Sequence, residues 1–339
     1  MRMMSACTFF LIFLLLFLAG VCAANLLGPK GFRLEVQEIS DAGAAGGFIH
    51  GPGDYGRTIT VDNRKRYYEI HVPAAYDKSA AVPLVLVFHG GGSDQGIIRF
   101  ESQMDTTSDR EGFITIYPAG TNRRLLLKNR ILFWNDGRPY QDGTFSEVDD
   151  IKFIEMLLVD VQKMFKVDSR KIYACGYSNG AQFSFQVAKQ LSDRIAAMAA
   201  VAGQRSVDEH FPPPGRPLAV MQFAGLQDTI APYAGGVPHF EAELKADIKP
   251  VPETIRSWVE FNGCSSSPEV NRIGKAVMNR YGGCRGGAEV VLWTLEDGGH
   301  TWPGGNVIAA AEKFGLGNIN RDINASDLMW DFFKRHPLQ

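Results

Sequence analysis

The pentapeptide Gly176-Tyr177-Ser178-Asn179-Gly180 decides the fold of this chain. It fits the pattern G-x-S-x-G, in which a serine occupies a tight turn between a buried strand and a helix. An apolar run over residues 171–175 precedes it, and a helical pattern over residues 179–191 follows it. Because so short a pattern also arises by chance, its meaning depends on what the rest of the chain provides.

A second glycine motif, His89-Gly90-Gly91-Gly92, lies upstream of the pentapeptide. In this order the two motifs are typical of hydrolases that attack a carbonyl group through a serine. Glycines let the backbone approach a substrate closely, since they carry no side chain. We therefore expect an oxyanion hole formed by the N–H group of Gly91 or Gly92 and by that of Asn179, where the helix dipole helps.

A serine hydroxyl needs a base within hydrogen-bond distance and a carboxylate that orients the base. In folds with this pentapeptide the three residues follow in the order serine, acid and histidine, each after the end of a strand. Asp228 follows an apolar run over residues 218–223, and His300 follows another over residues 290–295. The sequence therefore predicts Ser178 as the nucleophile, His300 as the base and Asp228 as the acid.

Each of these residues also has a simpler interpretation. Asp228 would suit an ordinary turn, where aspartate is common. His300 stands in the stretch Gly-Gly-His-Thr-Trp-Pro, which predicts a constrained loop. Trp302 in that loop and Tyr177 beside the serine are expected to contact the substrate, although tryptophans are often core residues. The other histidines, which we do not expect to be the base, are His50, His71, His89, His210, His239 and His336.

The apolar runs predict a mostly parallel sheet. Runs that are apolar on both faces belong to parallel strands covered by helices, and helical patterns fall between them here. An antiparallel hairpin at the N-terminal end is predicted over residues 57–61 and 66–72, with a turn at Asp62-Asn63. The predicted strands are residues 82–88, 113–117, 171–175, 195–201, 218–223 and 290–295, and the predicted helices are residues 149–166, 179–191 and 326–334. Together they indicate an α/β fold with helices on both faces of the sheet.

Composition excludes some classes of function. The chain has 339 residues, of which 45% are hydrophobic, and its formal net charge is −2. This supports a single large domain with a sizeable core. Because a chain with this net charge has no overall positive electrostatic potential, we expect no nucleic-acid partner.

The N-terminal residues predict export. Arg2, an apolar run over residues 9–18 and small residues near position 24 are typical of a signal peptide over residues 1–24. Lipidation of Cys22 is the alternative, and Val21 disfavours it. We expect a secreted or periplasmic protein without stable membrane insertion after cleavage. Residues 25–56 are rich in glycine, which predicts a flexible segment before the folded domain. Residues 57–339 are predicted to form a single catalytic domain.

Three cysteines follow the signal peptide. Cys175 ends an apolar run and is expected to be a small buried residue. Cys264 and Cys284 both lie in stretches rich in glycine and serine, where a disulfide could close a loop. Export would permit such a bond.

Four stretches of the chain resemble the secreted poly(3-hydroxybutyrate) depolymerase-like esterases, which are close relatives of single-domain feruloyl and acetylxylan esterases. The resemblance extends over residues 55–339. It is carried by EVDDIKFI (147–154), GYSNGA (176–181), GGHTWPGG (298–305) and DINASDLMWDFFKRHP (322–337).

The resemblance implies an α/β-hydrolase fold and the hydrolysis of carboxylic esters without a metal or other cofactor. Its catalytic triad maps onto Ser178, Asp228 and His300. It also implies that Cys264 and Cys284 are bridged, and that Trp134 helps to line the site.

Two stretches depart from the family. Ala224-Gly225 replaces a frequent His-Gly before the loop of the acid, and little depends on it because that histidine is not the base. Residues 120–132 (GTNRRLLLKNRIL) suit a solvated loop with one apolar anchor. The alternative hypothesis is a cationic rim that selects acidic substrates, formed by Arg123, Arg124, Lys128 and Arg130.

The sequence thus predicts an exported serine ester hydrolase that acts on hydroxyalkanoate oligomers or similar polyesters. The alternative is a feruloyl or acetylxylan esterase acting on plant polysaccharide side chains. A peptidase with the same triad order is disfavoured, because such enzymes usually carry a further large domain. A secreted binding protein that keeps the fold without the chemistry is the remaining alternative.

Overall fold

The computed structural model describes residues 36–39, 50–122, 132–138, 147–206, 213–237, 247–308, 311 and 314–339. The predicted signal peptide, Cys22 and most of the predicted flexible segment lie outside these residues. So do Arg123, Arg124, Lys128 and Arg130, on which the hypothesis of a cationic rim rests. Among the residues described, no helix is long and apolar enough to cross a membrane.

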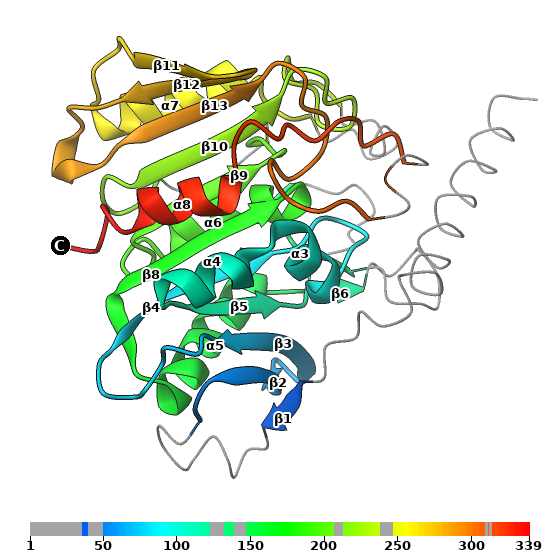
Figure 1. Cartoon of the computed structure of the whole chain (residues 1–339), viewed down its shortest axis with the longest axis vertical. Helices are drawn as coiled ribbons and strands as arrows, with labels where there is room; N and C mark the ends of the chain where they lie inside the picture. The colour runs from blue at the N-terminus through cyan, green and yellow to red at the C-terminus, as the bar shows by residue number, and fades with distance from the viewer. Residues whose placement is uncertain are drawn as a thin grey trace, which may run out of the picture.

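An 11-stranded sheet runs through the described part of the molecule, in the order β1-β2-β3-β5-β4-β8-β9-β10-β13-β12-β11 (Figure 1). Neighbouring strands from β5 to β13 are parallel, and both outer regions contain antiparallel pairs. The strands are β1 (Gln37–Ile39), β2 (Gly53–Val61), β3 (Arg64–Val72), β4 (Val82–Phe88), β5 (Ile114–Pro118), β8 (Val167–Tyr177), β9 (Ala197–Val201), β10 (Ala219–Gly225), β11 (Glu269–Ile273), β12 (Ala276–Tyr281) and β13 (Val290–Leu295). A separate pair joins β6 (Thr121–Asn122) to β7 (Leu132–Phe133). The predicted, mostly parallel sheet is confirmed.

Helices cover both faces of the sheet, as predicted. The buried hydrophobic side chains of α5 (Asp150–Met164), α6 (Asn179–Gln190) and α7 (Val251–Asn262) belong to one cluster. Those of α3 (Gln95–Ser102), α4 (Met104–Glu111) and α8 (Ala325–Phe333) belong to a second cluster. Figure 1 shows α3, α4 and α8 in front of the strands. The β-strands therefore separate two cores.

The N-terminal hairpin is present and is longer than predicted. Strands β2 and β3 pair antiparallel, and Asp62 and Asn63 between them have φ angles of 47° and 61°. Such angles suit the two-residue turn that fits the twist of a hairpin. Strand β2 begins at Gly53, inside the range predicted as a flexible segment, because Tyr55 is buried and packs against Phe165 with ring centroids 5.9 Å apart.

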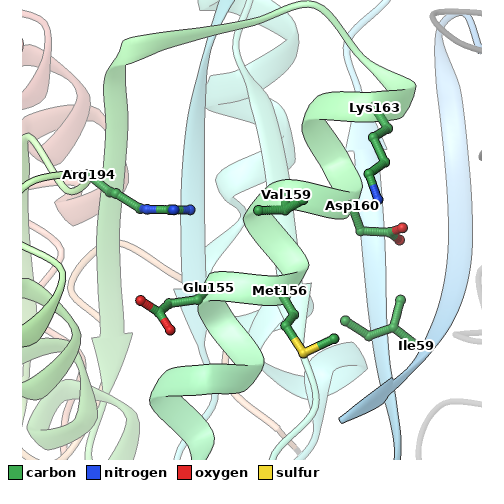
Figure 2. Close-up of a pocket in the computed structure, with 7 residues that line it drawn as sticks. All are labelled: Ile59, Glu155, Met156, Val159, Asp160, Lys163 and Arg194. Atoms are coloured by element: carbon green, nitrogen blue, oxygen red, sulfur yellow. The ribbon is translucent and has the colours of Figure 1, made fainter.

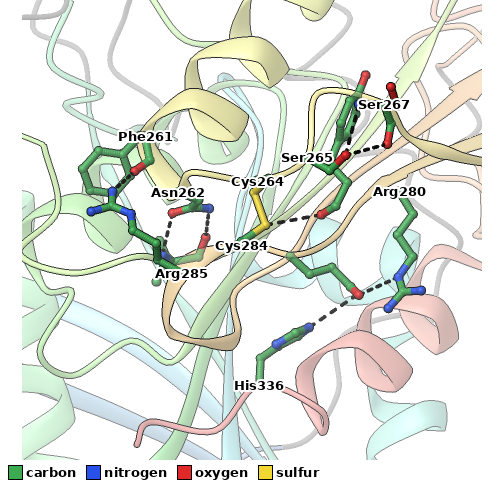
Figure 3. The surroundings of a disulfide bond; sticks show 12 residues. Phe261, Asn262, Cys264, Ser265, Ser267, Arg280, Cys284, Arg285 and His336 are labelled. Atoms are coloured by element: carbon green, nitrogen blue, oxygen red, sulfur yellow. Dashed lines mark hydrogen bonds and ion pairs between the residues drawn. A yellow bond between two sulfur atoms is a disulfide. The ribbon is translucent and has the colours of Figure 1, made fainter.

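The disulfide lies near the start of β13, at the opposite end of that strand from His300. Cys264 follows α7 and is bonded to Cys284, which follows β12 (Figure 3). The bond confirms the predicted pair. Cys175 is free and buried, and its burial raises the pKa of the thiol, as expected of a core cysteine.

Candidate active site

Three strands bring the predicted triad together at one edge of the sheet. Ser178 follows β8, Asp228 follows β10 and His300 follows β13. These strands run in the same direction, so their carboxyl ends meet at the same edge. The Nε2 atom of His300 lies 2.9 Å from Oγ of Ser178, and its Nδ1 atom lies 2.8 Å from Oδ2 of Asp228. A histidine in this position can accept the proton of a serine hydroxyl.

The turn at Ser178 requires small neighbours. Ser178 has φ 55° and ψ −120°, an unusual conformation for a residue with a side chain, which costs about 1–3 kcal/mol. A Cβ atom on Gly176 would lie 2.3 Å from the carbonyl oxygen of Gly180. A Cβ atom on Gly180 would lie 2.4 Å from the carbonyl oxygen of Phe88. Gly176 is therefore needed for the turn from β8 into α6, and Gly180 for the close approach of α6 to the end of β4.

Asp228 is held in place by its own loop. Its Oδ1 atom accepts hydrogen bonds from the N–H groups of Ile230 at 2.9 Å and Ala231 at 2.8 Å. Its Oδ2 atom is the one that faces His300. Because the side chain is only 6% exposed, these hydrogen bonds fix the direction of the carboxylate.

Tyr177 holds the loop of His300. Its hydroxyl donates a hydrogen bond of 2.5 Å to the carbonyl oxygen of His300, whose N–H group donates to Leu316 at 2.6 Å. The Tyr177 side chain is buried, so it supports the site from beneath. This differs from the prediction that it contacts the substrate.

The two predicted donors of the glycine motif are not equivalent. The N–H group of Gly92 donates to the carbonyl oxygen of Leu132 at 2.9 Å, which corrects its assignment to the oxyanion hole. Within the described ranges, no group accepts a hydrogen bond from the N–H of Gly91 or of Asn179. A Cβ atom on Gly91 would lie 3.4 Å from the Cβ atom of Asn179, so the two residues are close neighbours.

His89 is not the base and has a structural role. Its Nε2 atom accepts a hydrogen bond of 3.0 Å from the N–H of Gly120, so the proton is on Nδ1, which donates to the carbonyl oxygen of Gly90 at 2.7 Å. Burial lowers the pKa of His89 to about 4. The ring is neutral at pH 7. Its hydrogen bonds hold the loop of Gly90, Gly91 and Gly92, which we call the glycine loop.

Both tryptophans predicted to line the site are core residues. Trp134 is fully buried, and its ring stacks on that of Phe183 with centroids 4.7 Å apart. Trp302 is 2% exposed, and its indole N–H donates to the hydroxyl of Ser326 at 3.1 Å. The structure therefore corrects the prediction for both tryptophans. Their large apolar rings are stabilised by packing in the core beneath the loops that carry them.

Two other features lie away from the triad. A hollow of about 280 Å³ lies beside α5, and Figure 2 shows the side chains that line it. It is lined by Ile59, Glu155, Met156, Val159, Asp160, Lys163 and Arg194. A cluster that could hold a metal ion comprises Asp54, His71 and Asp105. The guanidinium of Arg99 contacts both carboxylates and offsets part of their negative charge.

One residue pair near the site has no counterpart among the sequence predictions. Asp136 and Arg138 are buried and form an ion pair next to Asn179. They belong to the stretch Asn-Asp-Gly-Arg that follows Trp134. In the sequence this stretch looks like an ordinary turn. Only the burial of the two side chains in the structure shows that their charges must be paired.

Comparisons with known proteins point to one class of enzyme. Over 234 residues, 68% of this chain, the sequence is 27% identical to feruloyl esterase B of Piromyces equi, and the chain spans 42% of that protein. Over 256 residues, 72% of this chain, it is 23% identical to feruloyl esterase D of Neurospora crassa and covers 78% of it. No protein-family model matches the chain.

The fold matches solved esterases. An acetyl xylan esterase from Aspergillus awamori superimposes with a TM-score of 0.50 at 16% identity, covering 77% of this chain and 99% of that one. The fold is that of the α/β hydrolases. The two curated relatives compared above are both named feruloyl esterases.

Proposed function

We propose that the protein is a serine esterase in which Ser178, His300 and Asp228 form the catalytic triad. The observation that carries the proposal is the chain of two hydrogen bonds, 2.9 Å and 2.8 Å long, from the Ser178 hydroxyl through His300 to Asp228. A buried carboxylate behind the histidine favours the tautomer with its proton on Nδ1, which leaves Nε2 free to accept. The relatives named esterases support the same chemistry.

The proposed reaction has two steps. Oγ of Ser178 attacks the ester carbonyl, and His300 takes the serine proton. The tetrahedral intermediate collapses, the alkoxide leaves with the proton from His300, and an acyl group stays on Ser178. Water then attacks this acyl-enzyme with His300 again as base, which releases the acid and restores the serine. In both steps the negative oxygen accepts from the N–H groups of Gly91 and Asn179.

We propose esters of plant polysaccharide side chains, with ferulate as the acyl group, as the substrates. Feruloyl and acetyl xylan esterases are the relatives that support this choice. It was the alternative to hydroxyalkanoate oligomers in the sequence-based prediction, and the relatives favour it. Export, as the signal sequence over residues 1–24 predicts, would bring the enzyme to such polymers.

A comparison of substrates tests the proposal. Initial rates would be measured on methyl ferulate, an aryl acetate and a 3-hydroxybutyrate oligomer, with the Ser178→Ala variant as the blank. We expect the highest kcat/KM on methyl ferulate. A clear preference for the oligomer would overturn the choice of substrate while leaving the triad intact. Rates equal to the blank on every ester would overturn the proposed function itself.

A further inference from the structure

A short segment connects the two sides of the proposed oxyanion hole. We call residues 132–138 the bridging segment. On the side of the glycine loop, its Leu132 carbonyl oxygen accepts from the N–H of Gly92 at 2.9 Å. The indole N–H of Trp134 donates to the carbonyl oxygen of His89 at 3.1 Å. The bridging segment therefore fixes where the glycine loop lies.

The same segment holds the side chain of Asn179 on the other side. The N–H group of Trp134 donates to Oδ1 of Asn179 at 2.8 Å. The Nδ2 group of Asn179 donates to Oδ2 of Asp136 at 2.7 Å and to the carbonyl oxygen of Trp134 at 3.3 Å. Asn179 is 3% exposed. Its amide is thus held at both ends, which fixes the first residue of α6 and the direction of its main-chain N–H.

Arg138 balances the charge of Asp136. Its Nε and Nη2 atoms donate to Oδ2 of Asp136 at 2.9 Å and 2.6 Å. The two side chains are 1% and 0% exposed, so water does little to screen them. A buried carboxylate this close to the oxyanion hole would repel the negative oxygen of the transition state unless a cation accompanied it.

We propose that Asp136 and Arg138 are positioning residues for the oxyanion hole. Asp136 locks the Asn179 side chain so that the N–H of Asn179 points at the developing oxyanion. Arg138 neutralises Asp136, so that this lock carries no net negative charge. The inference rests on the proposed function, because it assigns the pair a role in stabilising the intermediate formed on Ser178.

Charge and hydrogen bonding can be separated by three variants. Arg138→Met removes the cation and leaves the carboxylate. Asp136→Asn removes the negative charge but keeps an oxygen that can accept from Asn179. The double variant Asp136→Asn/Arg138→Met keeps that acceptor with neither charge. Asp160→Asn is the matched control, since Asp160 of α5 forms a comparable ion pair with Arg57 of β2 at 2.8 Å, and neither residue belongs to the proposed site.

We expect Arg138→Met to lower kcat by about 100-fold, the size of effect seen when an oxyanion donor is lost, with KM changed by less than about threefold. The double variant should recover about tenfold in kcat relative to Arg138→Met, because the negative charge of Asp136 is also removed. Recovery by removing a second residue is a result that simple destabilisation would not produce. Arg138→Lys, which keeps the charge, should retain most of the activity.

The affinity for an aryl boronic acid supplies a readout tied to the intermediate. Such an acid forms a tetrahedral anionic adduct with a reactive serine, so its Ki should rise in parallel with the loss of kcat. The proposal is overturned if Arg138→Met and the double variant change kcat no more than Asp160→Asn does. It is also overturned if the double variant is less active than Arg138→Met. If Arg138→Met does not fold, Asp136→Asn and the double variant are compared with the control, and the proposal is overturned if both have the kcat of Asp160→Asn.

The same experiment separates this inference from the proposed function. A wild-type enzyme that requires Ser178 while the Arg138 variants behave like the control would refute only the role of the pair. A wild-type rate equal to that of Ser178→Ala would refute the triad, and with it the basis for any positioning role.

Discussion

The Tyr177 hydroxyl donates a hydrogen bond of 2.5 Å to the carbonyl oxygen of His300. The residue before the proposed nucleophile thus holds the loop of the proposed base. Burial raises the pKa of Tyr177 well above its usual value, so the hydroxyl remains a donor at every pH at which the enzyme would work. The spacing between Ser178 and His300 depends on this bond as well as on the strands.

Replacing Tyr177 tests that dependence. We expect Tyr177→Phe to destabilise the fold by about 1 kcal/mol, the net value of a typical hydrogen bond, and to lower kcat several-fold. KM should change little, because the hydroxyl points at the His300 carbonyl group. Denaturant unfolding and steady-state kinetics on one ester measure both quantities. A large rise in KM would instead favour the original prediction that Tyr177 contacts the substrate.

The glycine loop should be sensitive to a side chain at Gly91. A Cβ atom on Gly91 would lie 2.6 Å from the Phe133 ring, whereas a Cβ atom on Gly96 would lie 3.5 Å from Oδ1 of Asp94. We expect Gly91→Ala to lower kcat by about 10- to 100-fold by moving an oxyanion donor. Gly96→Ala, in the following helix, is the control and should be near wild type. Equal kinetics for the two variants would argue against Gly91 as a donor.

His89 should make stability depend on pH. Its pKa is lowered to about 4 in the folded protein, whereas an unfolded histidine titrates near its usual value. The unfolded chain therefore binds more protons between these values, and the free energy of unfolding falls as pH drops from about 6.5 to 4, by up to about 3 kcal/mol. Unfolding measured at pH 7 and pH 4.5 should show a smaller loss for His89→Asn than for wild type.

The disulfide should contribute stability without activity. Cys264 and Cys284 are 20 positions apart, and closing a loop of this size contributes about 3 kcal/mol in the chain-entropy model. We expect Cys264→Ser/Cys284→Ser to unfold at lower denaturant concentration while the folded enzyme keeps its kcat. A specific loss of kcat in fully folded protein would mean that the bond also shapes the site.

Most of the sheet could be predicted because each central strand carries its own signal. Strands β4 and β13 have the bounds read from their apolar runs, residues 82–88 and 290–295. Helix α7 was missed although Val251, Ile255 and Trp258 have helical spacing, so a signal was present. Helix α4 carries no such signal, because only Met104, Thr107 and Ser108 of its sequence MDTTSDRE are buried. Its position depends on packing against distant elements.

At the site, the residues that follow strand ends were predictable and those defined by distant contacts were not. Motif and chain order placed Ser178, Asp228 and His300 after their strands, where the structure brings them together. The occupied N–H of Gly92 depends on Leu132, 40 positions away along the chain, and nothing local indicates that contact. The buried state of Trp134 likewise depends on its stacking with Phe183.

The central claim is that Ser178 is the nucleophile. The most direct measurement is the intact mass of the protein after reaction with a fluorophosphonate, followed by peptide mapping and an esterase assay. We expect one adduct per chain, located on Ser178, with complete loss of ester hydrolysis, and no adduct on folded Ser178→Ala. Ester hydrolysis that persists in the variant, or an adduct on another residue that accounts for the inactivation, would contradict the proposed mechanism.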